Sequence, residues 1–383
     1  MSTTTRSSNF DTSGCSLLEI ESTFTRGFAG IQMVGNPSET CREGKDRAKA
    51  ALEFCGLPFP QKRLLISLTP GDIKKDGSQL DLPIAISLAL LLKKQPPAIN
   101  PKNWLFASEV SITGALKPVK GCIPMAISAI TANLEGIVLA SENAQEVENI
   151  HKFGLIHLPK MTILGFHQLI DVINWLFTGT HQPTKAPSVP QMSNSKTLDF
   201  DDMILSSQQK RLALCIASGF HNTILRGSPG SGKSMLAQRM GSILPQMTKK
   251  QHIEALQIYS SNMSHLPYQL LKGQPPFRSP HHQSSPAAVL GTPDFPGELS
   301  LAHGGILFLD EVTEFRRDLL ESLREPLETA TILSWRHSTP PWVPRPCSAA
   351  TVMAPTPRTT PSSPMAVKTV SPGDLTVRRM TSS

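Results

Sequence analysis

The chain has 383 residues, enough for two or three domains with separate cores, and a formal net charge of +7. Six basic residues and one acidic residue follow Trp335, so the rest carries only +2, which excludes a strongly basic body built for polyanions. The six cysteines are scattered, which excludes a disulfide framework, and the apolar runs are too short for a membrane span. The Ser/Thr-rich start excludes a secretory signal, so a cytoplasmic location is expected.

The first part of the chain reads as a disordered start followed by a mixed domain. Residues 1–14 show no apolar pattern, and we expect them to be disordered. Residues 15–178 alternate strand-like and helix-like patterns, which predict an α/β or α+β domain with its own core. Strands are predicted at 28–34, 63–68, 110–113 and 136–140. Helices are predicted at 39–55, 83–92 and 125–134, and the one at 83–92 is expected to be buried.

The second part begins after a polar segment. Residues 179–199 hold three prolines among polar residues and read as a linker. The second domain, 200–335, opens with a helix over 208–218 and a short buried strand over 221–225. From 336 to 383 the chain has nine Pro and fifteen Ser/Thr in 48 residues without periodicity, so we expect a disordered tail, translated out of frame.

A glycine-rich loop follows the strand at 221–225. Its sequence, GSPGSGKS, fits G-x-x-x-x-G-K-[ST] at every position and precedes a helix, which is the pattern of a phosphate-binding P-loop. Lys233 is predicted to contact the β and γ phosphates and Ser234 to complete the Mg²⁺ shell. The predicted nucleotide contacts are Gly227, Ser228, Pro229, Gly230, Ser231, Gly232, Lys233, Ser234 and Met235.

A second motif, Gly305-Ile-Leu-Phe-Leu-Asp310-Glu311, follows about 80 residues later. Four apolar residues predict a strand buried on both faces, and two carboxylates end it where ligands of open α/β sheets bind. We predict that Asp310 holds Mg²⁺ and that Glu311 is the general base, with Lys233 as the other catalytic residue.

These motifs and their neighbours resemble the magnesium-chelatase-like AAA+ proteins, most closely the ComM (YifB) subgroup. The similar stretches include Arg278-Ser-Pro-His281-His282, Pro296-Gly-Glu-Leu-Ser300 and, in the first domain, Lys75-Asp-Gly-Ser-Gln-Leu-Asp81. The resemblance covers about residues 19–335. It implies a Lon-protease-like (ribosomal-protein-S5-like) α+β domain followed by a P-loop AAA+ α/β domain that lacks its C-terminal part.

The resemblance also implies a function. It implies an ATPase that uses ATP and Mg²⁺, assembles into a ring, as a hexamer, and remodels DNA by branch migration in competence and recombination. Alternatives are a chelatase-type metal-insertion motor and an inactive product that at most binds nucleotide. The family's polar sensor, arginine finger and helical lid have no counterpart after Trp335, so we expect hydrolysis near background and a missing strand beside the second motif.

Two further expectations follow from the resemblance. The first domain carries Gln79 where the Lon protease has its serine, and Ile123 or a neighbour where it has its lysine, so no peptidase activity is expected. His281 and His282 lie on a segment that the family places toward the ring pore. A substrate-facing loop is therefore expected there, with plain packing as the alternative.

Overall fold

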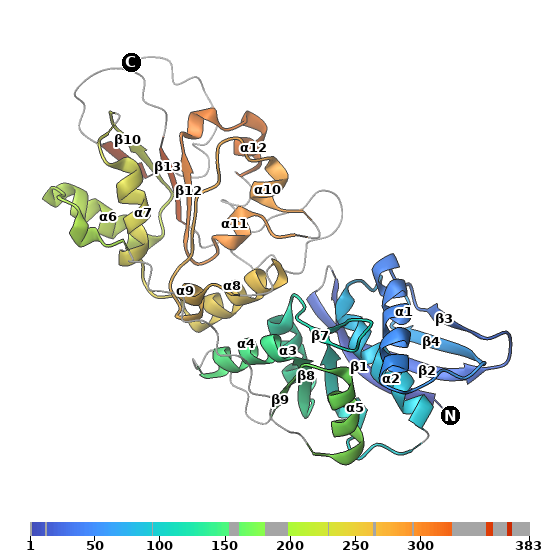
Figure 1. Cartoon of the computed structure of the whole chain (residues 1–383). Coiled ribbons are helices and arrows are strands. Elements are labelled where there is room, and N and C mark those ends of the chain that lie inside the picture. Colours follow the sequence, from blue (N-terminus) through green and yellow to red (C-terminus); the bar gives the residue numbers. More distant parts are fainter. Residues whose placement is uncertain are drawn as a thin grey trace. The chain divides into compact units, whose positions relative to one another are not determined.

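The computed structural model describes residues 2–11, 14–93, 95–152, 161–180, 198–228, 230–262, 266–292, 295–323, 350–354 and 366–369 (Figure 1). The chain divides into two compact units: the first comprises 1–189 with 260–266, and the second 190–259 with 267–383. Most of the proposed linker, 181–197, lies outside the described residues. No helix in the described ranges is long and apolar enough to cross a bilayer.

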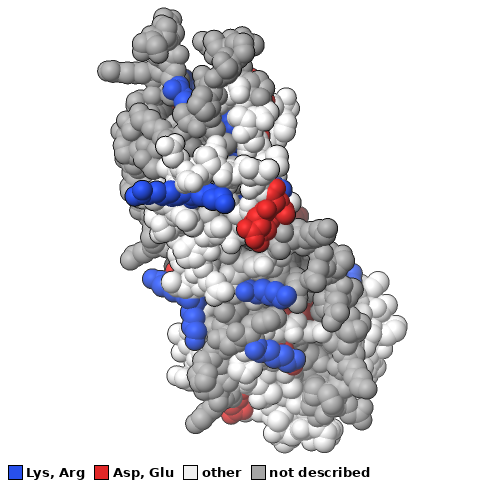
Figure 2. Space-filling model, turned by 90° about the vertical axis from the view of Figure 1, so that its left-hand side faces the viewer, with Lys and Arg blue, Asp and Glu red and all other residues white. Residues whose placement is uncertain are grey.

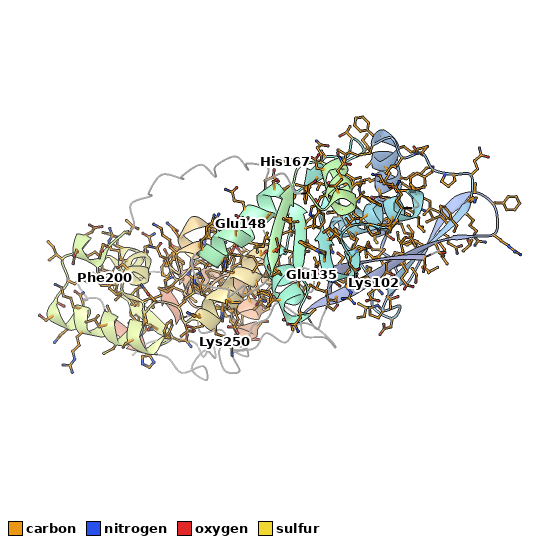
Figure 3. The ribbon with its side chains drawn as sticks, turned by 90° about the horizontal axis from the view of Figure 1, so that it is seen from below. Lys102, Glu135, Glu148, His167, Phe200 and Lys250 are labelled. Carbon is orange, nitrogen blue, oxygen red and sulfur yellow. The ribbon has the colours of Figure 1, made fainter. Side chains whose placement is uncertain are left out.

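The first unit is built on a seven-stranded mixed sheet in the order β3-β4-β2-β1-β5-β8-β9. The pairs β1–β2 and β2–β4 are antiparallel, whereas the remaining neighbours are parallel. The strands are β1 (Ser2–Asp11), β2 (Gly14–Thr25), β3 (Gly30–Val34), β4 (Arg63–Thr69), β5 (Trp104–Ala107), β8 (Gly136–Ala140) and β9 (Thr162–Phe166). Lys102 and Glu135 precede the neighbouring strands β5 and β8 (Figure 3), where the Glu135 amide donates to the Asn103 carbonyl at 2.8 Å.

Five helices and a small hairpin complete the described part of this unit. The hairpin pairs β6 (Glu109–Val110) with β7 (Leu116–Lys117). The helices are α1 (Glu39–Phe54), α2 (Asp81–Lys93), α3 (Cys122–Thr131), α4 (Ser141–Lys152) and α5 (Leu169–Thr178), with short 3₁₀ turns η1 (Ser78–Leu80) and η2 (Pro101–Asn103).

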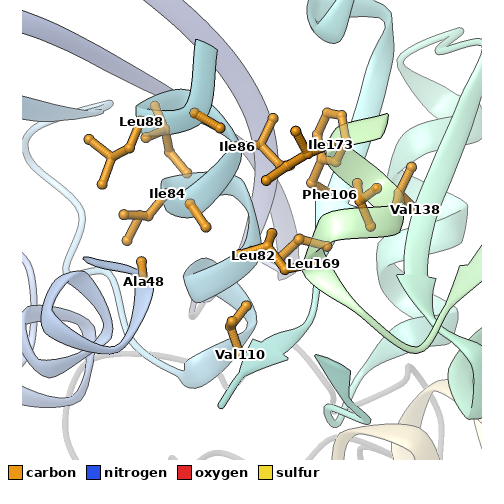
Figure 4. Close-up of a cluster of buried hydrophobic side chains, with 14 of the residues drawn as sticks. Ala48, Leu82, Ile84, Ile86, Leu88, Phe106, Val110, Val138, Leu169 and Ile173 are labelled. Carbon is orange, nitrogen blue, oxygen red and sulfur yellow. The ribbon is translucent and has the colours of Figure 1, made fainter. Parts of the chain in front are cut away.

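Helix α2 lies at the centre of the first core. Every residue from Asp81 to Leu91 is buried, as expected for a helix that is apolar on all sides. Ile86 and its neighbours on α2 pack with Phe106, Val138 and Ile173 from two strands and α5 (Figure 4). Helix α1 is instead buried on one face, and the Ser38 hydroxyl caps it by accepting from the Cys41 amide at 3.2 Å.

The expectation that residues 1–14 are disordered is wrong. Ser2–Asp11 forms β1, an interior strand that pairs with β2 along its whole length and with β5 at Arg6. Two of its buried hydroxyl groups donate to backbone carbonyls, Ser7 Oγ to Phe106 O at 2.8 Å and Thr5 Oγ1 to Pro83 O at 3.0 Å. The Ser8 hydroxyl is buried without a partner among the described residues. The strand therefore has no apolar alternation for the sequence to reveal.

The second unit contains a five-stranded sheet in the order β11-β12-β13-β10-β14, parallel except for β14. Its strands are β10 (Thr223–Arg226), β11 (Phe277–Arg278), β12 (Ile306–Asp310), β13 (Ala350–Ala354) and β14 (Ala366–Thr369). The helices are α6 (Ser207–Gly219), α7 (Lys233–Ile243), α8 (Lys249–Asn262), α9 (Tyr268–Leu271), α10 (Pro286–Leu290), α11 (Glu298–Leu301) and α12 (Arg317–Ser322), with turns η3 (Phe200–Asp202) and η4 (Val312–Glu314).

Strand β12 divides the second core between two faces of the sheet. Ile306 and Phe308 pack into a cluster with α6 and α7, whereas Leu307 and Leu309 pack into another with α10, α11 and α12. Alternate side chains of a strand point to opposite faces, so four successive apolar residues are all buried. The predicted doubly buried strand is confirmed in this unit.

The expectation that the tail is disordered throughout is also wrong. Ala350–Ala354 forms β13 between β12 and β10, so the strand expected to be missing beside Asp310 is present. The run Ala-Thr-Val-Met-Ala can pair in a sheet, and its neighbours β10 and β12 determine that it does, whereas composition averaged over 48 residues concealed it. The tail's other residues, apart from β14, lie outside the described residues.

Candidate nucleotide-binding site

The P-loop joins β10 to α7 in the second unit. Thr223 and Leu225 anchor β10 in the core, and α7 begins at Lys233. Gly230 and Gly232 have φ of 75° and 84°, a left-handed conformation that glycine adopts without a steric penalty. No side chain caps α7, so its first-turn amides are available to an anion. Pro229, one of the predicted contacts, lies outside the described residues.

Two side chains of the loop have the chemistry that phosphate requires. Lys233 Nζ donates to the carbonyls of Gly227 at 3.0 Å and Ser228 at 2.9 Å, so the ammonium lies inside the loop's curve. The Ser231 hydroxyl is buried and has no hydrogen-bond partner among the described residues. A buried hydroxyl without a partner is costly, and a phosphate oxygen would satisfy it. These groups fit a bound polyphosphate.

The two motifs meet at Ser234 and Asp310. Ser234 Oγ donates to Asp310 Oδ2 at 3.0 Å, although 76 residues separate them in the chain. Hydroxyl and carboxylate oxygens are the ligands that Mg²⁺ takes in nucleotide sites, so this pair fits the ion. Met235 lies in the first turn of α7 and is half exposed.

Glu311 has an unusual backbone conformation at the end of β12. Its φ is 53°, a left-handed value that is uncommon for a residue with a side chain and that occurs often at functional sites. Its amide donates to Asp310 Oδ1 at 3.0 Å. Its carboxylate is about half exposed, with Oε2 3.8 Å from His282 Nδ1. The turn thus separates the two acids, leaving Asp310 on Ser234 and directing Glu311 toward His282.

A partly buried ion pair, which sequence reasoning did not identify, lies near the start of the segment that carries His282. Arg278, in β11, donates to Glu298 through Nε at 2.5 Å and a second nitrogen at 2.7 Å. These bonds raise the pKa of the Arg278 guanidinium. The rings of His281 and His282 stack with centroids 4.1 Å apart. Arg278 and Glu298 both stand in the motifs that carried the resemblance, which was the available signal.

In the described part of the chain, no three His, Cys, Asp or Glu side chains gather closely enough to hold a metal ion. The nucleotide site differs from such a cage, because a nucleotide-bound Mg²⁺ takes further oxygens from phosphate and water.

The Lon-like loop in the first unit has no nucleophile at the expected position. Gln79 is buried, and its Nε2 donates to the Asp76 carbonyl at 2.7 Å. Ile123 is fully buried in α3. Lys75 is also buried, and its Nζ donates to the Ile73 carbonyl at 2.6 Å rather than to a serine. An amide and an isoleucine cannot form the hydroxyl–amine pair that peptide hydrolysis of this type needs.

We therefore expect the full chain to release no peptide from casein or fluorogenic substrates. Ser78→Ala serves as the matched variant, because Ser78 is the hydroxyl nearest to Gln79 in the sequence. Wild type and Ser78→Ala should give the same fluorescence trace as buffer. Cleavage by wild type that disappears in Ser78→Ala would refute this expectation.

Similarity to known proteins agrees with this architecture. The family model "Magnesium chelatase, subunit ChlI" matches residues 199–372, and "Subunit ChlI of Mg-chelatase" matches residues 20–143. The first match extends to residue 372, whereas the resemblance was predicted to end at about residue 335. A Lon protease of Geobacter metallireducens is 23% identical over 167 residues, which are 42% of this chain and 20% of that protease.

Longer matches cover both domains. The uncharacterized protein YifB of Salmonella typhimurium is 39% identical over 320 residues, 82% of this chain and 60% of the relative. The competence protein ComM of Haemophilus influenzae is 36% identical over 323 residues, 83% of this chain and 61% of the relative. The chain thus spans about 60% of the length of these curated relatives.

Proposed function

Because the chain belongs to the magnesium-chelatase-like AAA+ family of ComM and YifB, with a Lon-like domain before its P-loop domain, we propose that it binds ATP with Mg²⁺ and hydrolyses it. The observation that carries the proposal is the 3.0 Å bond between Ser234 and Asp310. It joins the phosphate-binding loop to the acidic strand end, and nucleotide hydrolysis requires both.

Each residue has a chemical role in the proposal. Lys233 exchanges its two loop carbonyls for β- and γ-phosphate oxygens, while Ser231 donates its free hydroxyl. Ser234 and Asp310 hold Mg²⁺, which neutralises charge that develops on the phosphates. Glu311 accepts the proton of the attacking water, as its exposed carboxylate allows. The remaining contacts come from backbone amides between Gly227 and Met235.

The proposed partner is DNA. In this proposal the protein assembles into a hexameric ring in the cytoplasm and uses ATP to drive branch migration of the DNA. Two things support this: the name of a matched relative, a competence protein, and the shared order of a Lon-like domain and a P-loop domain. We also propose two domains, predicted at 15–178 and 200–335, with the first extended to include β1 and the second extended to include β13 and β14.

Two other functions remain as alternatives. A chelatase-type motor that drives metal insertion into a tetrapyrrole would follow from the family models' names. Co-purification with DNA rather than with a porphyrin-binding partner separates these two. A protein that binds nucleotide without turnover is the third, and the Glu311 experiment below decides it.

Glu311→Gln should retain ATP binding but lose phosphate release. The amide preserves the shape of the side chain but cannot accept the proton, which lowers the rate by about 10²-fold or more. Phosphate release and equilibrium binding of a fluorescent ATP analogue are measured on the same samples. Glu321→Gln is the matched control, because Glu321 lies on α12 in a surface pair with Arg317.

The control should release phosphate as wild type does. Phosphate release by wild type no greater than that of buffer, with binding intact, would contradict hydrolysis and favour the nucleotide-binding alternative. Release by Glu311→Gln equal to that of an active wild type would contradict the role of Glu311 as general base.

A further inference from the structure

A basic and aromatic projection lies at one end of the first unit's sheet. We define the tip as Arg26, Gly27, Phe28, Lys62 and Arg63, from the turn between β2 and β3 and the segment entering β4. Strand register brings them together, since Arg63 pairs with both Thr25 and Gly30. The turn projects beyond β3 and β4 in Figure 1 and again in Figure 3.

Phe28 is almost wholly in water. Its exposed fraction is 98%, and every residue from 26 to 30 is exposed. A phenylalanine side chain offers a large apolar area and a flat π face, and both are unused here. Folding of the unit gains little from this side chain, which leaves its ring free to contact another molecule.

The tip has no acidic side chain to balance its three cations. Residues 22–38 and 54–71 contain no Asp or Glu. Glu21 lies four residues before Thr25 on β2, about 13 Å along a strand, which exceeds the Debye length of about 8 Å at physiological salt. Among the described residues, no ion pair includes a tip residue.

The cations are instead arranged by neutral groups. Arg63 donates to the Gln32 side chain, and Lys62 Nζ lies 5.8 Å from the centroid of the Phe24 ring. A Cβ added to Gly27 would lie 2.8 Å from Arg63 Cδ, so the guanidinium stem packs against a residue that has to be small. The tip therefore presents positive charge beside a free aromatic face.

The charge at the tip comes from three side chains. Residues 22–38 and 54–71 hold no charged residues besides Arg26, Lys62 and Arg63. On the face drawn in Figure 2, Lys and Arg side chains stand apart rather than forming one continuous band. A short contact that combines phosphate pairing with ring stacking matches the tip.

We propose that the tip binds single-stranded nucleic acid, with Phe28 stacking on a base and Arg26, Lys62 and Arg63 pairing with phosphates. Unpaired strands expose both base faces and phosphates, which is what an aromatic beside basic residues recognises. In a duplex the bases are already stacked, and a ring would have to wedge them apart. One phenylalanine offers too little apolar area for stable membrane insertion.

The inference rests on the proposed partner, DNA, and requires no ATP hydrolysis. The experiment measures fluorescence anisotropy of a short fluorescein-labelled oligo(dT) with the full chain. Phe28→Ala should weaken binding about 5- to 150-fold, the loss of one stacked base. Arg26→Ala should reduce the slope of log K against log salt by about 0.7.

Matched controls come from the β6–β7 hairpin of the same unit. Ile112→Ala and Lys117→Ala remove an exposed apolar and an exposed basic side chain there, and both should bind as wild type. Thermal melts should coincide for all variants, because the changed side chains are exposed. Tip variants that bind oligo(dT) as tightly as wild type would overturn the inference, as would Phe28-dependent binding to phosphatidylserine vesicles without oligo(dT) binding.

The two proposals fail in different ways. Glu311-dependent phosphate release together with unchanged oligo(dT) binding by Phe28→Ala would overturn only the tip. Loss of oligo(dT) binding in Phe28→Ala supports the tip, even if no phosphate release depends on Glu311.

Discussion

Lys233→Ala is expected to abolish measurable binding of ATP with Mg²⁺. The lysine is the cation within the P-loop's curve, where its Nζ is held by the carbonyls of Gly227 and Ser228. In the nucleotide complex these bonds are replaced by charged bonds to phosphate, each worth about 1.5–3 kcal/mol. Loss of two such bonds weakens binding by at least about 100-fold.

The measurement is isothermal calorimetry with a non-hydrolysable ATP analogue and Mg²⁺. Lys210→Ala is the matched control, because Lys210 is an exposed lysine on α6 in the same unit. The control should bind as wild type does. Equal affinity in Lys233→Ala and wild type would show that the nucleotide binds elsewhere.

The second large effect concerns stability of the first unit. Arg47→Ala should lower its free energy of unfolding by about 3–5 kcal/mol, because it leaves the Asp81 carboxylate buried without its partner. Arg47 Nε lies 2.8 Å from Asp81 Oδ2 and a second nitrogen 3.1 Å from Oδ1, and the Asp81 side chain has no exposed surface. The bonds to Asp81 raise the pKa of Arg47, so its charge is retained at all accessible pH.

Urea unfolding monitored by tryptophan fluorescence reports this change, since Trp104 and Trp175 lie in the same core. Lys49→Ala is the control on the same helix, where Lys49 and Glu53 form an exposed pair at 3.9 Å worth under about 1 kcal/mol. A midpoint for Arg47→Ala no lower than that for Lys49→Ala would contradict the argument.

Much of the second unit was predictable because its signals are local. The glycine loop, the apolar strand and the terminal acids each require particular residue types within a few positions. The motifs GSPGSGKS and ILFLDE are therefore enough to predict the loop and the buried strand that ends in two acids. The overall architecture, a Lon-like domain before a P-loop domain, was predicted from the family resemblance and is confirmed by the family matches.

The missed elements depend on distant partners. Strand β1 is polar, and it is stabilised by hydroxyl bonds to Phe106 and Pro83, about 80 to 100 residues away, which no local pattern shows. Strand β13 is a five-residue run inside a Pro-rich tail, and its neighbours in the sheet, β10 and β12, decide its conformation. Propensity is a weak guide where tertiary contacts decide the state.

The same limit applies to the site. Sequence reasoning named Glu311 and His282 separately, but it gave neither their 3.8 Å approach nor the left-handed turn at Glu311. Neither is visible as a spacing in the chain. Which atoms contact Mg²⁺ and nucleotide stays a prediction until the complex is measured.

The most direct test of the central claim is a crystal structure of the full chain with Mg²⁺ and a non-hydrolysable ATP analogue. The account predicts that the β and γ phosphates lie within the loop from Gly227 to Ser234, with Lys233 Nζ on their oxygens. The direct bond between Ser234 and Asp310 should open to admit Mg²⁺, with Glu311 facing the γ phosphate. Density for the analogue at any other place in the chain, with the 3.0 Å bond unchanged, would contradict the account.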